Sequence, residues 1–125
     1  MKMFDIVIVD DYPMVRQGFA LLVSLYDDMR VVGMGSNGYE AIALCQTHQP
    51  DMLVIDYQMP KMDGITAIRY IRQQFPLLPI ILLSSLSDNI HPQAVTTSEV
   101  SLHLLKESNG HDILATIRKF FCLPV

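Results

Sequence analysis

Five short apolar runs recur along the chain, mainly composed of isoleucine, valine and leucine. They occupy residues 4–9, 31–34, 52–55, 79–83 and 102–105. A run of this length, bounded by glycine, proline, asparagine or aspartate, is typical of a buried strand. The pattern therefore predicts five strands.

The segments between these runs carry apolar residues at helical spacing. Pro13 suits the first position of the first helix, where its missing N–H costs nothing. A second helix is expected over residues 39–47, a third begins at an N-cap, Asp63, and the last ends before Pro124. The expected apolar stripes are Val15, Phe19, Leu22, Val23 and Tyr26 in the first helix, Ile42 and Cys45 in the second, Ile65, Ile68, Tyr70 and Ile71 in the third, and Ile113, Ile117, Phe120 and Phe121 in the last.

One helix is predicted to be weak. In residues 89–100, Pro92 lies near the start, and Val95, Thr96 and Thr97 are poor helix formers. We expect this helix to be short or mobile.

Five repeats of strand and helix predict an α/β fold with a doubly wound parallel sheet, because crossovers between parallel strands are right-handed. The strand order that we expect is 2-1-3-4-5, as in flavodoxin-like folds. The length of 125 residues fits a single domain over residues 1–125. Half of the residues are hydrophobic and only 18% are charged, which suits strands that are buried on both faces.

Composition also excludes several functions. A net charge of −4 with scattered lysines and arginines argues against direct nucleic-acid binding by this chain. Cys45 and Cys122 lack partners at metal-ligand spacing, so both are expected to be reduced, buried thiols. A secretory signal and an apolar run of about 18 residues are both missing, so we expect a cytoplasmic protein without a membrane partner.

Polar side chains follow four of the predicted strands. Asp10 and Asp11 follow the first strand, Asp56 the third, Ser84 the fourth and Lys106 the fifth. In an open parallel sheet, ligands bind beyond the carboxyl ends of the strands, near the switch point between strands one and three. Each residue alone has an ordinary explanation, such as a helix cap for the acidic pair, but their joint placement favours a site.

The residue types in this set point to phosphoryl chemistry. Three carboxylates close together repel one another, and a hard cation such as Mg²⁺ relieves this repulsion. Lys106 and Ser84 provide a positive charge and a hydrogen-bond donor for a phosphate. Asp56 is the best candidate for a nucleophile that forms an aspartyl phosphate.

Several segments together resemble the receiver domain of bacterial two-component response regulators. The sequence that follows the first strand is most similar to that of the NarL/FixJ branch, which is of the LuxR type. Members of this branch usually carry a C-terminal helix-turn-helix domain. The similar segments are residues 10–18, 37–41, 50–64, 79–84 and 104–106. The resemblance implies a CheY-like fold and a signalling domain that catalyses only its own phosphorylation and dephosphorylation.

The resemblance also implies roles for individual residues. Asp56 would accept phosphate from a histidine kinase or a phosphotransfer protein. Asp11, Asp56 and the backbone carbonyl of Gln58 would bind Mg²⁺, and Asp10 would hold a metal-bound water. Lys106 would pair with the phosphoryl group.

Departures from the family concern the switching residues. Ser84 would move its hydroxyl to the phosphate, but the switch position on strand five, usually tyrosine or phenylalanine, is His103. This coupling is then altered or pH-dependent, since histidine titrates near neutrality; alternatively, His103 is simply exposed on an edge strand. Glu99 and Leu102 stand where the family usually has glycine, so the fourth helix is expected to differ in geometry.

Two alternatives stay open. A pseudo-receiver would keep the fold and the partner surface without phosphorylation, although intact acidic residues argue against it. A Mg²⁺-dependent phosphohydrolase would need a second aspartate two residues after Asp56, where Gln58 stands. The sequence also leaves open a homodimer, an output in transcription and a DNA-binding domain that follows residue 125.

Overall fold

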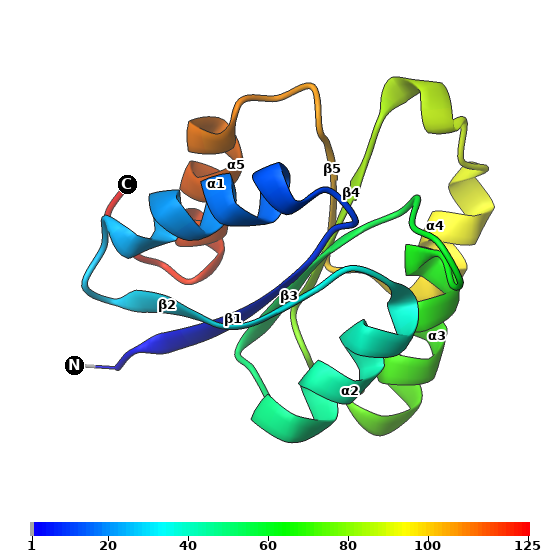
Figure 1. The fold of residues 1–125 in the computed structure, drawn as a ribbon, viewed down its shortest axis with the longest axis horizontal. Helices are drawn as coiled ribbons and strands as arrows, with labels where there is room; N and C mark the ends of the chain where they lie inside the picture. The colour runs from blue at the N-terminus through cyan, green and yellow to red at the C-terminus, as the bar shows by residue number, and fades with distance from the viewer. Residues whose placement is uncertain (1) are drawn as a thin grey trace.

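The computed structural model describes residues 2–125 and contains one sheet of five parallel strands (Figure 1). The strand order is β2-β1-β3-β4-β5, which confirms the predicted topology. The strands are β1 (Phe4–Val9), β2 (Met29–Gly35), β3 (Met52–Asp56), β4 (Ile80–Ser84) and β5 (Leu102–Leu105). The helices are α1 (Pro13–Ser24), α2 (Gly38–His48), α3 (Gly64–Gln74), α4 (Pro92–Ser98) and α5 (Gly110–Phe120), with a short 3₁₀ turn at Leu86–Asp88.

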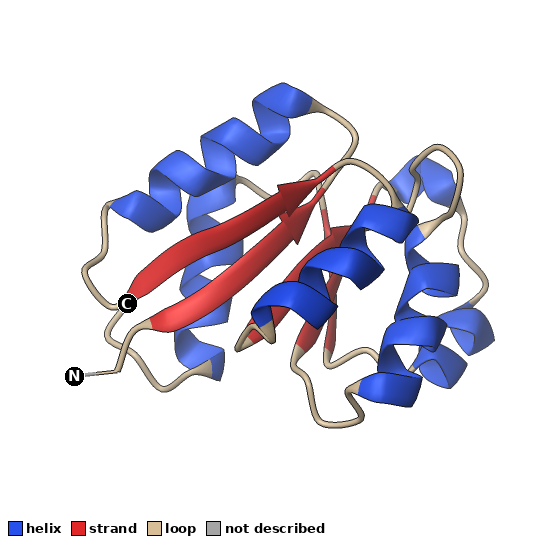
Figure 2. Cartoon of the chain, turned by 60° about the horizontal axis from the view of Figure 1, so that its bottom comes forward, coloured by secondary structure: helices blue, strands red, loops and turns tan. Residues whose placement is uncertain are grey.

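Helices cover both faces of the sheet, as Figure 2 shows. Successive strand residues point to opposite faces. In β1, Ile6 and Ile8 belong to the apolar cluster formed with α1 and α5, while Val7 and Val9 belong to the cluster formed with α2 and α3. The central strands β3 and β4 are buried along their whole length, which explains their uninterrupted apolar sequence.

Several expectations about single residues were wrong. Tyr70 is 53% exposed, because the buried stripe of α3 follows Ile65, Ile68 and Ile71 and Tyr70 lies off that stripe. Phe120 is 41% exposed, and α1 ends at Ser24, before Tyr26.

The two thiols also differ from each other. Cys45 is buried in α2 as expected, and burial raises the pKa of its thiol to about 12. Cys122 was expected to be buried in a helix, but it is exposed. It follows the end of α5 and has a positive φ of 59°, so the chain has left the helix before it.

Helix α4 is short, as expected, with seven residues, and its ends are held by side chains. The ring nitrogen Nδ1 of His91 accepts a hydrogen bond from the backbone N–H of Gln93 at the N-terminus. At the other end, Glu99 has a φ of 62°, in the left-handed region that favours glycine. Arg72 of α3 donates to the carbonyl oxygen of Glu99 at 2.9 Å and to that of Leu78 at 2.6 Å, which anchors this end.

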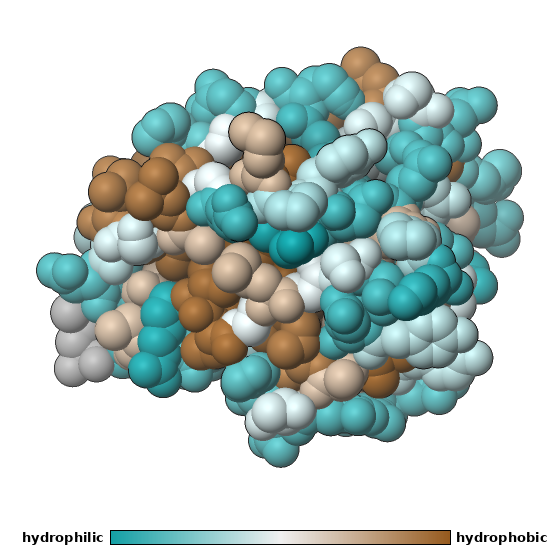
Figure 3. Space-filling view, in the orientation of Figure 1, coloured by the Kyte–Doolittle hydropathy of each residue, from teal (hydrophilic) through white to brown (hydrophobic). Residues whose placement is uncertain are grey.

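The outer surface carries both polar and apolar residues. In Figure 3, apolar atoms gather on the left of the view, where Figure 1 places α1 and β2. Leu21 of α1, Leu25 directly after it and Met34 of β2 are exposed apolar residues. Within residues 2–125, no helix is both long and apolar enough to cross a membrane.

A buried ion pair fixes α5 to the turn before β2. Arg118 is 3% exposed, and its guanidinium nitrogens lie 2.7 and 2.9 Å from the two carboxylate oxygens of Asp28. The guanidinium also lies 3.9 Å from the centre of the Tyr26 ring. The hydrogen bond from Arg118 lowers the pKa of Asp28, although burial opposes the change. This contact joins segments 90 residues apart in the sequence.

Replacing Arg118 by glutamine should lower the free energy of unfolding by about 3–5 kcal/mol, because Asp28 then keeps its charge without a partner. Urea unfolding measures the change. Lys119→Gln is the matched control: Lys119 is exposed on the same helix, so its effect should stay within about 0.5 kcal/mol. Equal stability of the two variants would contradict the role of the ion pair.

Candidate functional site

Three carboxylates meet at the carboxyl edge of the sheet. Asp10 follows β1 and Asp56 ends β3, and these strands are neighbours, so parallel pairing brings their ends together. Asp11 comes from the turn that leads into α1. One carboxylate oxygen of each residue lies within 4.8 Å of the others. Asp10 and Asp56 are buried, at 2% and 3% exposure.

Lys106, the residue after β5, supplies the opposite charge. Its Nζ forms an ion pair with Oδ2 of Asp10 at 3.0 Å and donates a hydrogen bond to Oδ2 of Asp56 at 3.1 Å. Burial disfavours the charge on Lys106, but the two carboxylates outweigh this effect and raise its pKa. The backbone N–H of Lys106 donates to the carbonyl of Ser84, which fixes where the side chain starts.

The acidic cluster is not neutralised by this lysine. Burial is the main cause that raises the pKa of Asp56 to about 6, and the neighbouring Asp10 adds to it against the effect of Lys106. Oδ1 of Asp11 is buried without a hydrogen-bond partner, and Oδ2 of Asp10 is buried with the ammonium of Lys106 as its ion-pair partner. Buried oxygens of this kind are ligands for a hard cation.

An open cavity of about 280 Å³ lies beside the carboxylates. Four of the residues that the sequence analysis selected line it, namely Asp11, Asp56, Gln58 and Lys106. Sequence reasoning missed four further lining residues, Tyr12, Ser85, Ser87 and Asp88. Their position in the turns that follow β1 and β4, at the same edge of the sheet, was the signal that would have found them.

Ser84 lies at the expected strand end, but its hydroxyl points elsewhere. Ser84 is 2% exposed, and its Oγ lies 2.6 Å from Nε2 of His103, which is exposed on the edge strand β5. Ser84 is absent from the residues that line the acidic cavity. The structure therefore groups the carboxylates with Lys106 and Gln58, and pairs Ser84 with His103.

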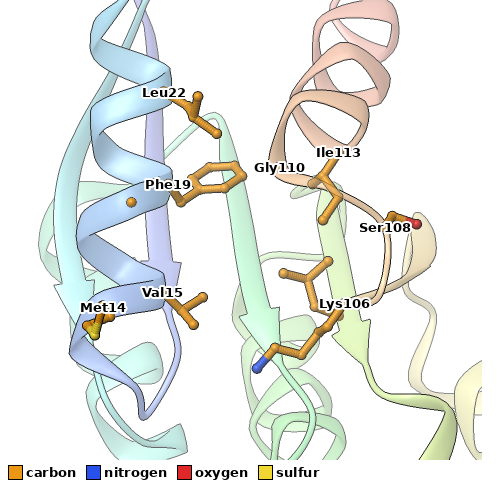
Figure 4. A pocket seen from close by; sticks show the side chains of 10 residues that line it. Met14, Val15, Phe19, Leu22, Lys106, Ser108, Gly110 and Ile113 are labelled. Carbon is orange, nitrogen blue, oxygen red and sulfur yellow. The ribbon is translucent and has the colours of Figure 1, made fainter.

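A second cleft, of about 330 Å³, borders the site between α1 and α5 (Figure 4). Figure 4 shows Phe19 and Leu22 of α1 and Ile113 of α5 turned toward the space between the helices. Lys106 lines both cavities. Among the residues that line the second cleft, only Lys106 and Ser108 have polar side chains, so its surface is mainly apolar.

An aspartate cluster bridged by a lysine, at the carboxyl edge of a 2-1-3-4-5 parallel sheet, defines the receiver class of signalling domain. A family model described as the response regulator receiver domain matches residues 6–118, and the chain belongs to this family.

Relatives place the chain near the LuxR-type regulators. It is 37% identical over 111 residues to the uncharacterized transcriptional regulatory protein YhcZ of Bacillus subtilis, covering 89% of this chain and 52% of that protein. It is 32% identical over 114 residues to the response regulator VraR of Staphylococcus aureus, covering 91% and 54%. A LuxR-family two-component response regulator from Aurantimonas sp. superposes with a TM-score of 0.83 at 25% identity, covering 97% of this chain and 86% of that one. The chain thus spans about half the length of the two curated relatives.

The raised pKa of Asp56 predicts a pH-dependent effect on stability. The carboxyl has a pKa of about 6 in the folded protein against an ordinary value of 3.8, so its ionisation opposes folding increasingly as the pH rises from about 4 and fully above about 6. Asp56→Asn should therefore stabilise the metal-free protein near pH 8, by at most about 3 kcal/mol at ~1.4 kcal/mol per pKa unit. The gain should shrink as the pH falls through 6 and vanish near pH ~4.

Urea unfolding in the presence of a chelator, repeated from low to high pH, measures this difference. Asp27→Asn serves as control, because Asp27 is exposed and its replacement should leave the profile unchanged. A variant Asp56→Asn that is less stable than the unmodified protein near pH 8 would contradict the prediction.

Proposed function

We propose that the chain is a phosphoacceptor domain in which Asp56 receives a phosphoryl group. The observation that carries the proposal is the contact of Lys106 with both Asp10 and Asp56 beside an open, polar cavity. In such a site the lysine can hold a phosphate anion in the cavity. A carboxylate beside it, here Asp56, can then react with that anion as a nucleophile.

The same residues fit Mg²⁺. The buried Oδ1 of Asp11, which has no hydrogen-bond partner, supports this, and the nearby carboxylates of Asp10 and Asp56 complete the oxygen set. Asp11, Asp56 and the backbone carbonyl of Gln58 would hold the ion, and Asp10 would hold one of its waters. A bound Mg²⁺ neutralises charge that develops on phosphate oxygens.

The remaining chemistry belongs to the side chains of this chain. A carboxylate oxygen of Asp56 attacks the phosphorus of a phosphohistidine, a new P–O bond forms and the P–N bond breaks, and the histidine of the donor leaves and takes up a proton. Lys106 pairs with the phosphoryl oxygens and thereby replaces the contact that it makes with Asp56 before the reaction. Hydrolysis of the acyl phosphate by water restores the carboxylate.

The donor is then a histidine kinase or a phosphotransfer protein, in the cytoplasm. The similarity to LuxR-type regulators supports an output in transcription through a DNA-binding domain, since the relatives are about twice as long. A homodimer is compatible with this role.

Labelling with a small phosphodonor tests the proposal. Acetyl phosphate and Mg²⁺ should add one phosphoryl group to the unmodified chain, seen by intact-protein mass spectrometry. The label should disappear in Asp56→Asn and on removal of Mg²⁺ by a chelator. Asp27→Asn, at an exposed position away from the site, should be labelled normally.

Undiminished labelling of Asp56→Asn would show that another residue accepts the phosphoryl group. An unmodified chain that takes no phosphate and binds no Mg²⁺ would reject the phosphoacceptor function itself.

A further inference from the structure

A fourth carboxylate, that of Asp88, borders the acidic cavity. Asp88 ends the 3₁₀ turn that follows β4, and it lines this cavity together with Asp56 and Lys106. The ammonium of Lys106 is already engaged by Asp10 and Asp56. Within residues 2–125, Asp88 forms no ion pair, so no basic side chain neutralises its charge at the cavity.

Hydrogen bonds hold the Asp88 carboxylate in place. Its Oδ2 accepts from the backbone N–H of Ser85 at 2.7 Å. In return, the side chain of Ser85 accepts from the backbone N–H of Asp88, which completes a capping box. The carboxylate therefore keeps a defined orientation beside the cavity.

The turn that carries Asp88 is attached to the segment that carries Lys106. The backbone N–H of Leu86 donates to Oε1 of Glu107 at 2.8 Å. Directly before these residues, the backbone N–H of Lys106 donates to the carbonyl of Ser84 at 2.8 Å. These bonds fix one wall of the cavity relative to the other, so Asp88 acts as a fixed charge on a molecule that enters the cavity.

Phosphoryl donors differ in the charge of the group that leaves. In a phosphoimidazole, the ring is protonated on its second nitrogen when the P–N bond breaks and the P–O bond to Asp56 forms, so the leaving group carries positive charge until neutral imidazole departs. In acetyl phosphate, a P–O bond breaks instead, and an acetate anion departs. The transferred phosphoryl group is the same in both reactions, so its repulsion by Asp88 affects both rates alike.

We propose that Asp88 is a specificity-determining residue that favours donors with a cationic leaving group, such as a phosphohistidine, over acyl phosphates. This proposal rests on the proposed phosphoacceptor function. A carboxylate at the cavity stabilises positive charge on a departing imidazole ring and destabilises the negative charge that develops on a departing carboxylate. Because Asp88 is partly exposed, solvent screens its charge and keeps the effect modest.

Labelling rates with phosphoimidazole and with acetyl phosphate, measured with Mg²⁺ by intact-protein mass spectrometry, test this proposal. Asp88→Asn removes the charge and keeps an oxygen that can accept from Ser85. The ratio of the phosphoimidazole rate to the acetyl phosphate rate should fall about fivefold, the size expected for one partly screened charge.

Glu107→Gln is the matched control. It also removes the charge of a carboxylate that accepts from the backbone of this turn, but Glu107 does not line the cavity. Its rate ratio should stay within about twofold of the unmodified protein, because the charge of Glu107 is exposed to solvent.

Ionic strength separates an effect of charge from a change in the shape of the turn. The difference in rate ratio between the unmodified protein and Asp88→Asn should shrink as sodium chloride is raised to about 1 M, where the Debye length is about 3 Å. A difference that comes from a displaced turn would not depend on salt in this way.

The outcomes distinguish this proposal from the function on which it rests. An unchanged rate ratio in Asp88→Asn overturns the role of Asp88, as does a change of both rates by the same factor. A difference that persists at high salt, or that is equally large in Glu107→Gln, overturns it as well. If the unmodified protein is labelled by neither donor, the phosphoacceptor function fails together with this proposal.

Discussion

The central constraint of this structure is the repulsion among the carboxylates of Asp10, Asp11 and Asp56, which a single lysine offsets only in part. The sheet order determines this arrangement. Strands β1 and β3 are neighbours, so their terminal acids must lie close together, while β5 is separated from β3 by β4. Lysine has a side chain long enough to cross that gap, and Lys106 reaches both Asp10 and Asp56. Burial prevents water from screening the remaining charge, so the pKa of Asp56 is raised to about 6 despite the lysine. A cation bound to these oxygens would relieve the remaining repulsion.

Most of this arrangement was predictable from the sequence, because a parallel sheet converts strand ends into neighbours. The five apolar runs predicted the strands. A polar residue that follows such a run was predicted to lie at the carboxyl edge of the sheet. Side-chain contacts away from this edge of the sheet were not predictable. The Arg118–Asp28 pair is separated by 90 residues, and Arg72 contacts backbone carbonyls, which carry no residue-specific signal. The exposure of Cys122 follows from the place where α5 ends, and element boundaries are poorly determined by periodicity.

The Ser84 side chain shows what the sequence could not predict. Its place at the end of β4 followed from the sequence, but the direction of its hydroxyl did not. A serine side chain has one rotatable bond to its oxygen and several staggered positions of similar energy, so its partner is decided by what lies within reach. In this chain the residue within reach is His103, whose ring nitrogen forms a hydrogen bond that a phenylalanine at that position would lack. The departure from the family pattern that looked like a weakness in the sequence is therefore a direct contact in the structure.

The segment after Ser84 is anchored at its two ends by hydrogen bonds, and between them Ile90, Ala94 and Val95 pack, partly buried, against the core. Near its start, the N–H of Leu86 donates to Oε1 of Glu107, the residue after Lys106, at 2.8 Å. At its end, Arg72 holds the carbonyl of Glu99. Between these anchors lies the short helix α4, in which the hydroxyls of Thr96 and Thr97 bond back to helix carbonyls, an arrangement that stabilises a helix poorly. Such a segment opens or shifts at lower free energy than the buried strands β3 and β4. The first of these anchors lies beside the site, because the N–H of Lys106 donates to the carbonyl of Ser84 and the next residue, Glu107, binds Leu86.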